Sequence, residues 1–198
     1  MTRIKICGLF REEDITAVNE AQPDYIGFVF AKSRRQVSID QAARLNRHLS
    51  ANILAAGVFV NPELEQVVAL CRAGIISIVQ LHGQETASFV TQVKQASGCP
   101  VIKAVRMDAN CDLATWQSTD ADYLLLDNGP GGTGLAFDWQ QIPPLTKPFF
   151  LAGGIDAGNL ACALAHNPYC IDVSSGVETN GYKDRNKILQ IVSMVRAQ

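Results

Sequence analysis

The sequence alternates short apolar runs with stretches of helical periodicity about eight times, and this alternation limits the folds open to the chain. The runs are nearly continuous in hydrophobic residues, as in the strands of a parallel sheet that helices cover. We expect eight strands, at residues 3–7, 24–30, 53–60, 76–81, 100–105, 123–126, 149–151 and 170–173. Polar residues recur directly after these runs, so the candidate functional groups stand at strand ends.

Two parallel architectures fit this alternation. A doubly wound open sheet gathers its functional residues at one switch point, whereas a closed eight-stranded barrel brings the carboxyl ends of all strands to one face. Because polar residues follow several strands, we predict an α/β fold, a single (βα)8 TIM barrel domain spanning residues 1–198. A chain of this length is short for such a barrel. We therefore expect shortened helices in the fifth and sixth units, at 108–119 and around Trp139.

Local signals mark the boundaries of several helices. Asn61 followed by Pro62 predicts an N-cap with proline at the first helical position. Inward-facing apolar residues predict a helix over 85–96. Asp184 is expected to cap the last helix of the chain.

Composition excludes several classes of protein. The net charge is −2, with no long run of one sign, which argues against a nucleic-acid or membrane-surface partner. No run of 18 apolar residues predicts a transmembrane helix, and the start lacks the apolar segment of a secretory signal. The six cysteines form no C-x-x-C pair, so no metal site is expected. We expect a cytoplasmic protein with reduced thiols.

Small residues follow the last three predicted strands, at 131–134, 152–154 and 174–176. In barrels the loops after strands seven and eight often bind phosphate through exposed backbone N–H groups. Each loop alone is compatible with an ordinary turn, but three in consecutive units favour a phosphate site. The candidate residues are Gly132, Gly154, Ser174, Ser175 and Gly176.

The glycines at 129, 131 and 134 also form a literal G-x-G-x-x-G. No strong helical pattern follows them, and the next strand ends in glycines instead of the acidic residue that would hold a ribose. We therefore expect no nucleotide cofactor.

Two strand-end residues are candidates for acid–base chemistry. Cys7 closes the first strand, where a thiolate can act as a base or a nucleophile, although most cysteines are structural. Asp127 closes the sixth strand and can act as an acid only if it retains its proton, which apolar neighbours and a ligand anion favour. The alternative for Asp127 is a carboxylate that caps the following turn.

Three further residues are candidates for substrate binding. Arg35 can hold a carboxylate or phosphate with two hydrogen bonds, but Arg34 and Arg35 also fit an exposed surface pair. His82 ends the fourth strand, where a lone histidine is often structural. Asp172, at the end of the eighth strand, is as compatible with a structural role as with a functional one.

Taken together, these motifs closely resemble those of the phosphoribosylanthranilate isomerases of tryptophan biosynthesis. The matching segments span nearly the whole chain in the family's order. They are 5–8, 27–30, 32–35, 57–61, 79–83, 124–127, 131–134 with 137–139, 151–154 and 172–178.

The resemblance implies a (βα)8 barrel that catalyses an Amadori rearrangement without cofactor or metal. The substrate would be N-(5-phosphoribosyl)anthranilate, a small phosphorylated molecule. Asp127 would protonate the furanose ring oxygen, Cys7 would remove the proton from C2', and Arg35 would hold the anthranilate carboxylate. The glycine and serine residues given above would form the phosphate site. We expect a monomer or a homodimer.

Two other functions stay open from the sequence. A related barrel isomerase of histidine biosynthesis acts on an aminoimidazole ribonucleotide, but such enzymes tend to carry an aspartate where Cys7 stands, and they have an internal repeat not evident here. A non-catalytic sensor of phosphorylated sugars would keep the phosphate loops but would not need both an acid and a base.

Overall fold

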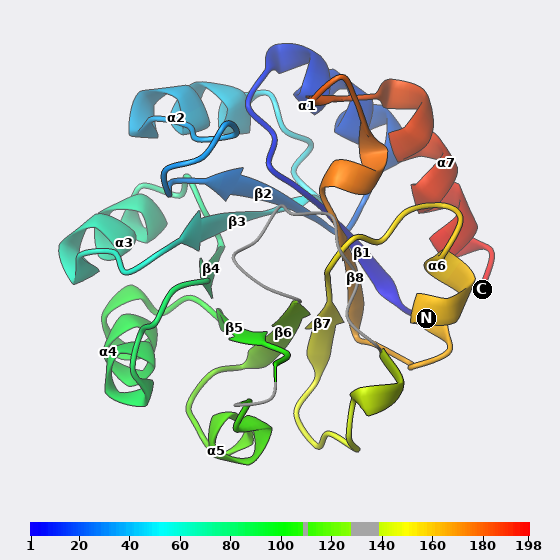
Figure 1. Ribbon diagram of the computed structural model, residues 1–198. Coiled ribbons are helices and arrows are strands. Elements are labelled where there is room, and N and C mark those ends of the chain that lie inside the picture. Colours follow the sequence, from blue (N-terminus) through cyan, green and yellow to red (C-terminus); the bar gives the residue numbers. More distant parts are fainter. Residues whose placement is uncertain (109–110, 128–138) are drawn as a thin grey trace.

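The computed structural model describes residues 1–108, 111–127 and 139–198 (Figure 1). Eight parallel strands close into a barrel in which each strand pairs with its sequence neighbours and β1 pairs with β8. The strands are β1 (Arg3–Cys7), β2 (Tyr25–Val29), β3 (Leu54–Phe59), β4 (Ile78–Leu81), β5 (Val101–Arg106), β6 (Tyr123–Asp127), β7 (Phe149–Leu151) and β8 (Cys170–Val173). The predicted barrel is confirmed.

Helices surround the barrel (Figure 1). They are α1 (Glu12–Ala21), α2 (Ile39–Arg47), α3 (Leu64–Arg72), α4 (Ala87–Ser97), α5 (Leu113–Gln117), α6 (Leu160–Leu164) and α7 (Arg185–Arg196), with 3₁₀ turns η1 (Trp139–Gln141) and η2 (Ser175–Val177). The expected shortening is confirmed for α5 and for the described part of the sixth unit, and α6 is also short. Within the described ranges, no helix is long and apolar enough to cross a bilayer.

The side chains of the barrel form an outer and an inner layer. Alternate residues of a strand face opposite sides, so Ile4 and Ile6 pack outward against the helices while Lys5 and Cys7 face inward. A smaller apolar cluster fills the interior. It includes Tyr25, Ile78, Leu125 and Phe150. Polar groups inside the barrel are therefore exceptions within an apolar layer, and each needs a partner.

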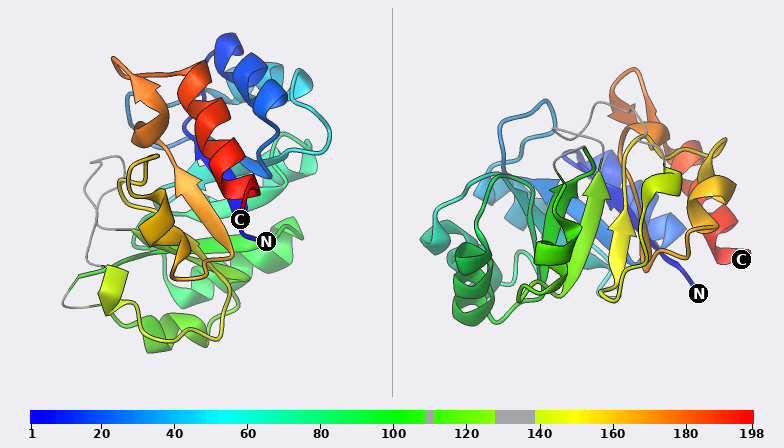
Figure 2. Two further views of the ribbon diagram at one scale, coloured as in Figure 1. Left: turned by 90° about the vertical axis from the view of Figure 1, so that its right-hand side faces the viewer. Right: turned by 60° about the horizontal axis from the view of Figure 1, so that its bottom comes forward.

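The carboxyl ends of the first and last strands meet at one mouth of the barrel. The register pairs Cys7 with Gly27 on one side, and Lys5 with Asp172 on the other. A hairpin of β9 (Glu178–Thr179) and β10 (Tyr182–Lys183) follows β8 at this mouth. Figure 2 shows the hairpin at the end of the barrel away from both chain termini.

The helix after β3 begins later than the sequence predicts. Asn61 does not cap it, because α3 starts at Leu64 with Glu63 as its N-cap. The backbone of Asn61 is left-handed, with φ 47°, a conformation that asparagine tolerates. Its side-chain oxygen accepts a hydrogen bond of 2.8 Å from the backbone nitrogen of Gln84, so it joins two neighbouring loops.

The predicted helix over 85–96 also starts too early. Its cap is Thr86, whose hydroxyl accepts a hydrogen bond from the Phe89 nitrogen, and α4 begins at Ala87. Glu85 instead lies in the preceding loop, buried against Lys103. The last helix is capped as predicted, because the Asp184 carboxylate accepts from two backbone nitrogens of its first turn.

Candidate active site

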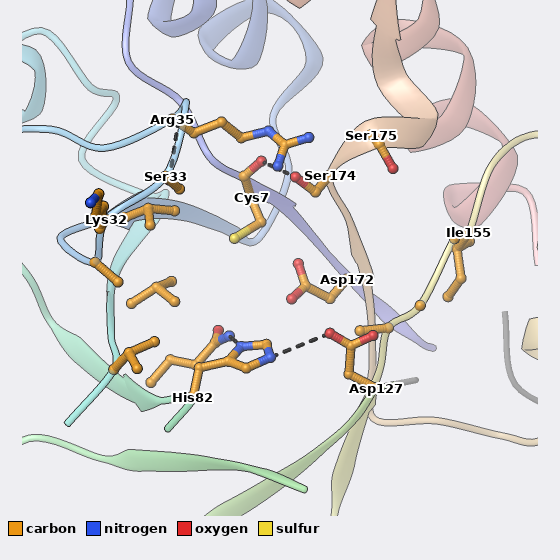
Figure 3. Close-up of a pocket in the computed structure, with 18 residues that line it drawn as sticks. Cys7, Lys32, Ser33, Arg35, His82, Asp127, Ile155, Asp172, Ser174 and Ser175 are labelled. Atoms are coloured by element: carbon orange, nitrogen blue, oxygen red, sulfur yellow. Dashed lines mark hydrogen bonds and ion pairs between the residues drawn. The ribbon is translucent and has the colours of Figure 1, made fainter. Parts of the chain in front are cut away.

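A cavity of about 160 Å³ opens at the carboxyl ends of the strands (Figure 3). Most of the predicted site residues line it, including both candidates for acid–base chemistry. These residues are Cys7, Arg35, His82, Asp127, Gly154, Asp172, Ser174 and Ser175. Cys7 and Asp127 therefore share one mouth of the barrel and one pocket.

Cys7 is the last residue of β1, and two small features of the chain fix its surroundings. Gly27 lies beside it, and a Cβ there would come within 2.7 Å of the Cys7 sulfur. The Ser174 hydroxyl donates a hydrogen bond of 3.1 Å to the Cys7 carbonyl. Burial raises the pKa of the thiol, while the positive charge of Lys5 opposes that rise. The pocket thus holds a desolvated thiol next to a buried cation.

Asp127 ends β6, and its carboxyl group contacts the His82 ring at the wall of the cavity. The His82 Nε2 atom lies 3.3 Å from Asp127 Oδ2. The side-chain nitrogen of Gln80 lies 3.0 Å from the other ring nitrogen, Nδ1. These contacts connect β4 to β6 and give the Asp127 carboxyl group a defined orientation (Figure 3).

Asp172 lies deeper in the pocket and binds Lys5. Its Oδ2 atom accepts a hydrogen bond of 2.8 Å from the Lys5 ammonium group, which is fully buried. The second oxygen, Oδ1, is also buried and has no hydrogen-bond partner within the described part of the chain. A buried acceptor of this kind is costly unless a ligand satisfies it.

Arg35 lines the pocket, but its guanidinium group is already paired. Glu178 of the hairpin accepts hydrogen bonds from Arg35 Nε at 2.7 Å and from Nη2 at 3.1 Å. Glu178 also binds Arg34 and Lys183. Burial works to raise the pKa of Glu178, but the hydrogen bonds from Arg35 and the charge of Lys183 bring it below its ordinary value. The carboxylate therefore holds Arg35 in one position at the rim.

The structure brings together only some of the residues predicted for the phosphate site. Gly153 and Gly154 follow β7 with φ angles of 90° and 68°, which only glycine adopts readily. Ser174 and Ser175 follow β8 and line the same cavity. Gly176 is not among the residues that line it, and a Cβ at this position would lie 2.0 Å from the Ile155 carbonyl oxygen, so the backbone packs closely there. Gly132 lies outside the described residues.

Sequence reasoning missed three polar residues of the site: Lys5, Gln80 and Glu178. Lys5 and Gln80 are buried polar side chains within apolar strands. That pattern is itself a signal, because a polar residue inside a barrel must serve a partner or a ligand. Glu178 acts through Arg35, a contact between residues 143 positions apart that no local pattern reveals.

The described residues contain no group of three or more His, Cys, Asp or Glu side chains that is placed to hold a metal ion. The polar groups at the mouth are instead a thiol, carboxyl groups, an imidazole and hydroxyls. These groups can donate, accept and transfer protons.

The fold and the site define the class: a (βα)8-barrel enzyme with a thiol and a carboxyl group around one pocket. The sequence matches the family described as N-(5'phosphoribosyl)anthranilate (PRA) isomerase over residues 4–194. A relative from Endomicrobium trichonymphae, named N-(5'-phosphoribosyl)anthranilate isomerase, is 46% identical over 202 residues, covering 100% of both chains. The chain belongs to the phosphoribosylanthranilate isomerase family.

Solved structures agree with this assignment. The phosphoribosyl anthranilate isomerase of Thermus thermophilus superposes with a TM-score of 0.90 at 31% identity, covering 99% of each chain. A second isomerase structure, in complex with reduced 1-(o-carboxyphenylamino)-1-deoxyribulose 5-phosphate, superposes with a TM-score of 0.86 at 31% identity over 100% of each chain. Among the functions left open by the sequence, the family supports the tryptophan-pathway isomerase.

Proposed function

We propose that the chain catalyses the Amadori rearrangement of N-(5-phosphoribosyl)anthranilate to 1-(2-carboxyphenylamino)-1-deoxyribulose 5-phosphate, a step of tryptophan biosynthesis. The family and its named members support this activity. The ligand in one solved relative is a reduced form of the same product. The observation that carries the proposal is that the Cys7 thiol, the Asp127 carboxyl group and two small-residue loops surround a single pocket.

In the proposed mechanism Asp127 is the general acid. It donates a proton to the furanose ring oxygen, the ring C–O bond breaks, and the nitrogen lone pair forms the C=N bond of a Schiff base. Cys7 then acts as the general base and removes the proton from C2', which gives an enolamine. Tautomerisation of the enolamine yields the ketone. A general acid or base in this position typically contributes about 10²–10⁴-fold in rate.

The remaining residues of the pocket are proposed to bind the two ends of the substrate. Arg35, oriented by Glu178, binds the anthranilate carboxylate with its guanidinium group. Asp172 Oδ1, the buried acceptor without a partner in the described chain, accepts a hydrogen bond from a sugar hydroxyl. His82 borders the sugar next to Asp127.

The phosphate group is proposed to lie against the loops after β7 and β8. Gly154, Ser174 and Ser175 border the cavity there and offer backbone N–H groups and hydroxyls. Gly132 and Gly176 are proposed to belong to the same site. Gly176 would act by letting the loop after β8 pack closely on Ile155.

The test is an assay of the purified protein with N-(5-phosphoribosyl)anthranilate. Loss of substrate fluorescence, with the product identified by mass spectrometry, is the expected result. The matched control is Cys162→Ala, which removes an exposed cysteine of α6 that does not line the pocket. This variant should convert the substrate at the unchanged rate. Absence of conversion above the buffer rate would refute the proposed function.

The assembly is proposed to be a monomer or a homodimer. A structural neighbour is described as monomers of a dimeric phosphoribosylanthranilate isomerase from Thermotoga maritima, at 31% identity and a TM-score of 0.85. Light scattering of the purified protein distinguishes the two states.

A further inference from the structure

Lys5 is a buried cation that no step of the proposed mechanism uses. It lies on β1 two residues before Cys7, and alternation along the strand places both side chains on the inner face of the barrel. Its exposed fraction is 0%. Burial of an ammonium group costs several kcal/mol unless anionic or polar partners compensate it. The residues that surround Lys5 therefore indicate the role of its positive charge.

The Lys5 ammonium group has two acidic neighbours. Asp172 Oδ2 lies 2.8 Å from Nζ. The second neighbour is Cys7, which lies two residues further along β1 on the same inner face. Burial works to lower the pKa of Lys5, but Asp172 and Cys7 raise it above its ordinary value. Lys5 is thus a cation that pairs with the Asp172 carboxylate and lies on the same strand face as Cys7.

A cation is what the proposed base requires. Cys7 removes a proton most effectively as a thiolate, and a desolvated thiolate is unfavourable without a positive neighbour. Lys183 is the other buried cation near Cys7, but its ammonium group is 2.7 Å from Glu178 and also donates to the Ser174 carbonyl. Lys5 shares strand β1 with Cys7 and faces the same interior.

We propose that Lys5 is a positioning residue for the base: its ammonium group stabilises the Cys7 thiolate, and Asp172 holds that ammonium group in place. The proposal rests on the proposed function only in taking Cys7 as the base. It assigns Asp172 a second task besides binding the sugar.

The proposal predicts that removal of the Lys5 charge and removal of the Asp172 charge shift the ionisation of Cys7 in opposite directions. Removal of the Lys5 charge takes away the cation that favours the thiolate, so the pH at which Cys7 ionises must rise. Asp172→Asn takes away a competing anion but keeps an amide oxygen that can hold the ammonium group, so that pH must fall. A merely structural ion pair would lower stability in both variants without shifting the ionisation of Cys7 in opposite directions.

The experiment measures the rate of Cys7 alkylation by iodoacetamide as a function of pH, with the Cys7 peptide followed by mass spectrometry. Lys5→Met should raise the midpoint by about one pH unit or more. Asp172→Asn should lower it. The matched control is Lys103→Met, because Lys103 is also a buried strand lysine but pairs with Glu85. That variant should leave the midpoint unchanged.

A midpoint that is unchanged or lowered in Lys5→Met would overturn the proposal, as would a raised midpoint in Asp172→Asn. If Lys5→Met does not fold, the double variant Lys5→Met/Asp172→Asn removes both charges together. Its midpoint must exceed that of Asp172→Asn alone, and equality would overturn the proposal.

Activity separates this proposal from the proposed function. In Lys5→Met, the acidic limb of the kcat–pH profile should move with the alkylation midpoint. If the wild-type protein fails to convert N-(5-phosphoribosyl)anthranilate while the alkylation midpoints shift as stated, the proposed function is wrong and the coupling between Lys5 and Cys7 holds. If the wild-type protein converts the substrate but the alkylation midpoints do not shift, the proposed function holds and the coupling between Lys5 and Cys7 is wrong.

Discussion

The imidazole of His82 points its Nε2 atom at Asp127 Oδ2, 3.3 Å away. The orientation of the Gln80 amide favours one tautomer of the ring. Its amide nitrogen, which only donates, lies 3.0 Å from Nδ1 of the ring. Nδ1 must therefore accept, and Nε2 of the neutral ring carries the hydrogen that faces Asp127. Gln80 and His82 together orient the proposed acid.

This relationship predicts the tautomer of His82. Nitrogen-15 NMR of the imidazole rings should find the Nε2–H form for His82, assigned by its loss in a His82 variant. His82→Leu should lower kcat by about 10²-fold, because the Asp127 carboxyl group loses the imidazole contact that helps to orient it. His82→Gln, which keeps a donor, should retain more activity. Equal rates in the two variants, or an Nδ1–H tautomer, would contradict this role.

The pairing of Glu178 with Arg35 and Lys183 predicts a pH dependence of stability. Because the pKa of Glu178 is lower in the folded chain than its ordinary value of 4.5, the unfolded chain binds more protons in the window between them. The stabilisation that the Glu178 ion pairs give to the folded chain is therefore complete above pH 4.5. It is lost as the pH falls through the pKa of Glu178 in the folded chain. Urea unfolding between pH 3 and pH 6 measures this loss, to within about ±10–15%.

Glu178→Gln should flatten that part of the profile. Glu63→Gln, at the N-cap of α3 where no side-chain cap bond forms, is the control and should keep the wild-type profile. A profile for Glu178→Gln with the same steepness as wild type would show that the ion pairs at the rim do not contribute.

The buried pair of Lys103 and Glu85 predicts a large effect on stability. Their charged groups lie 2.7 Å apart with 2% of each side chain exposed. Lys103→Met leaves Glu85 as an unpaired buried charge and should cost about 3–5 kcal/mol of unfolding free energy. The double variant Lys103→Met/Glu85→Gln should recover part of the lost unfolding free energy. Urea unfolding is the measurement, and additive losses in the double variant would contradict the pairing.

Gly176 is predicted to act through packing. A Cβ at this position would lie 2.0 Å from the Ile155 carbonyl oxygen, so Gly176→Ala must displace the loop after β8. We expect a loss of about 1–3 kcal/mol in stability. We also expect a raised KM, because Ser175 moves with the loop. Gly158→Ala, where the nearest atom to a Cβ lies 3.2 Å away, is the milder comparison. Unaltered stability and KM in Gly176→Ala would refute this role.

The sequence predicts the barrel well because each strand carries its own signal: an apolar run followed by a turn. Cys7 and Asp127 could be found for the same reason, since both stand at strand ends, where barrel chemistry occurs. Helix starts were less predictable. Asn61 and Glu85 resemble local helix signals, but both instead bind neighbouring loops, and such long-range hydrogen bonds override a local preference.

The electrostatic partners of the site could not be derived from local patterns. Lys5 meets Asp172 only because the first and eighth strands close the barrel. Arg35 meets Glu178 only because a hairpin after β8 lies at the loop after β2. The sequence identifies the residue types at the mouth, whereas the closed barrel determines which charges neutralise one another.

The central claim is that Asp127 and Cys7 act as acid and base on one substrate in one pocket. The most direct measurement is the single-turnover rate of substrate conversion by Cys7→Ala and Asp127→Asn, with binding of a product analogue measured in parallel. We predict that each variant loses about 10²–10⁴-fold in rate while the dissociation constant of the analogue stays within a few-fold of wild type. Near-normal turnover in both variants would contradict the account.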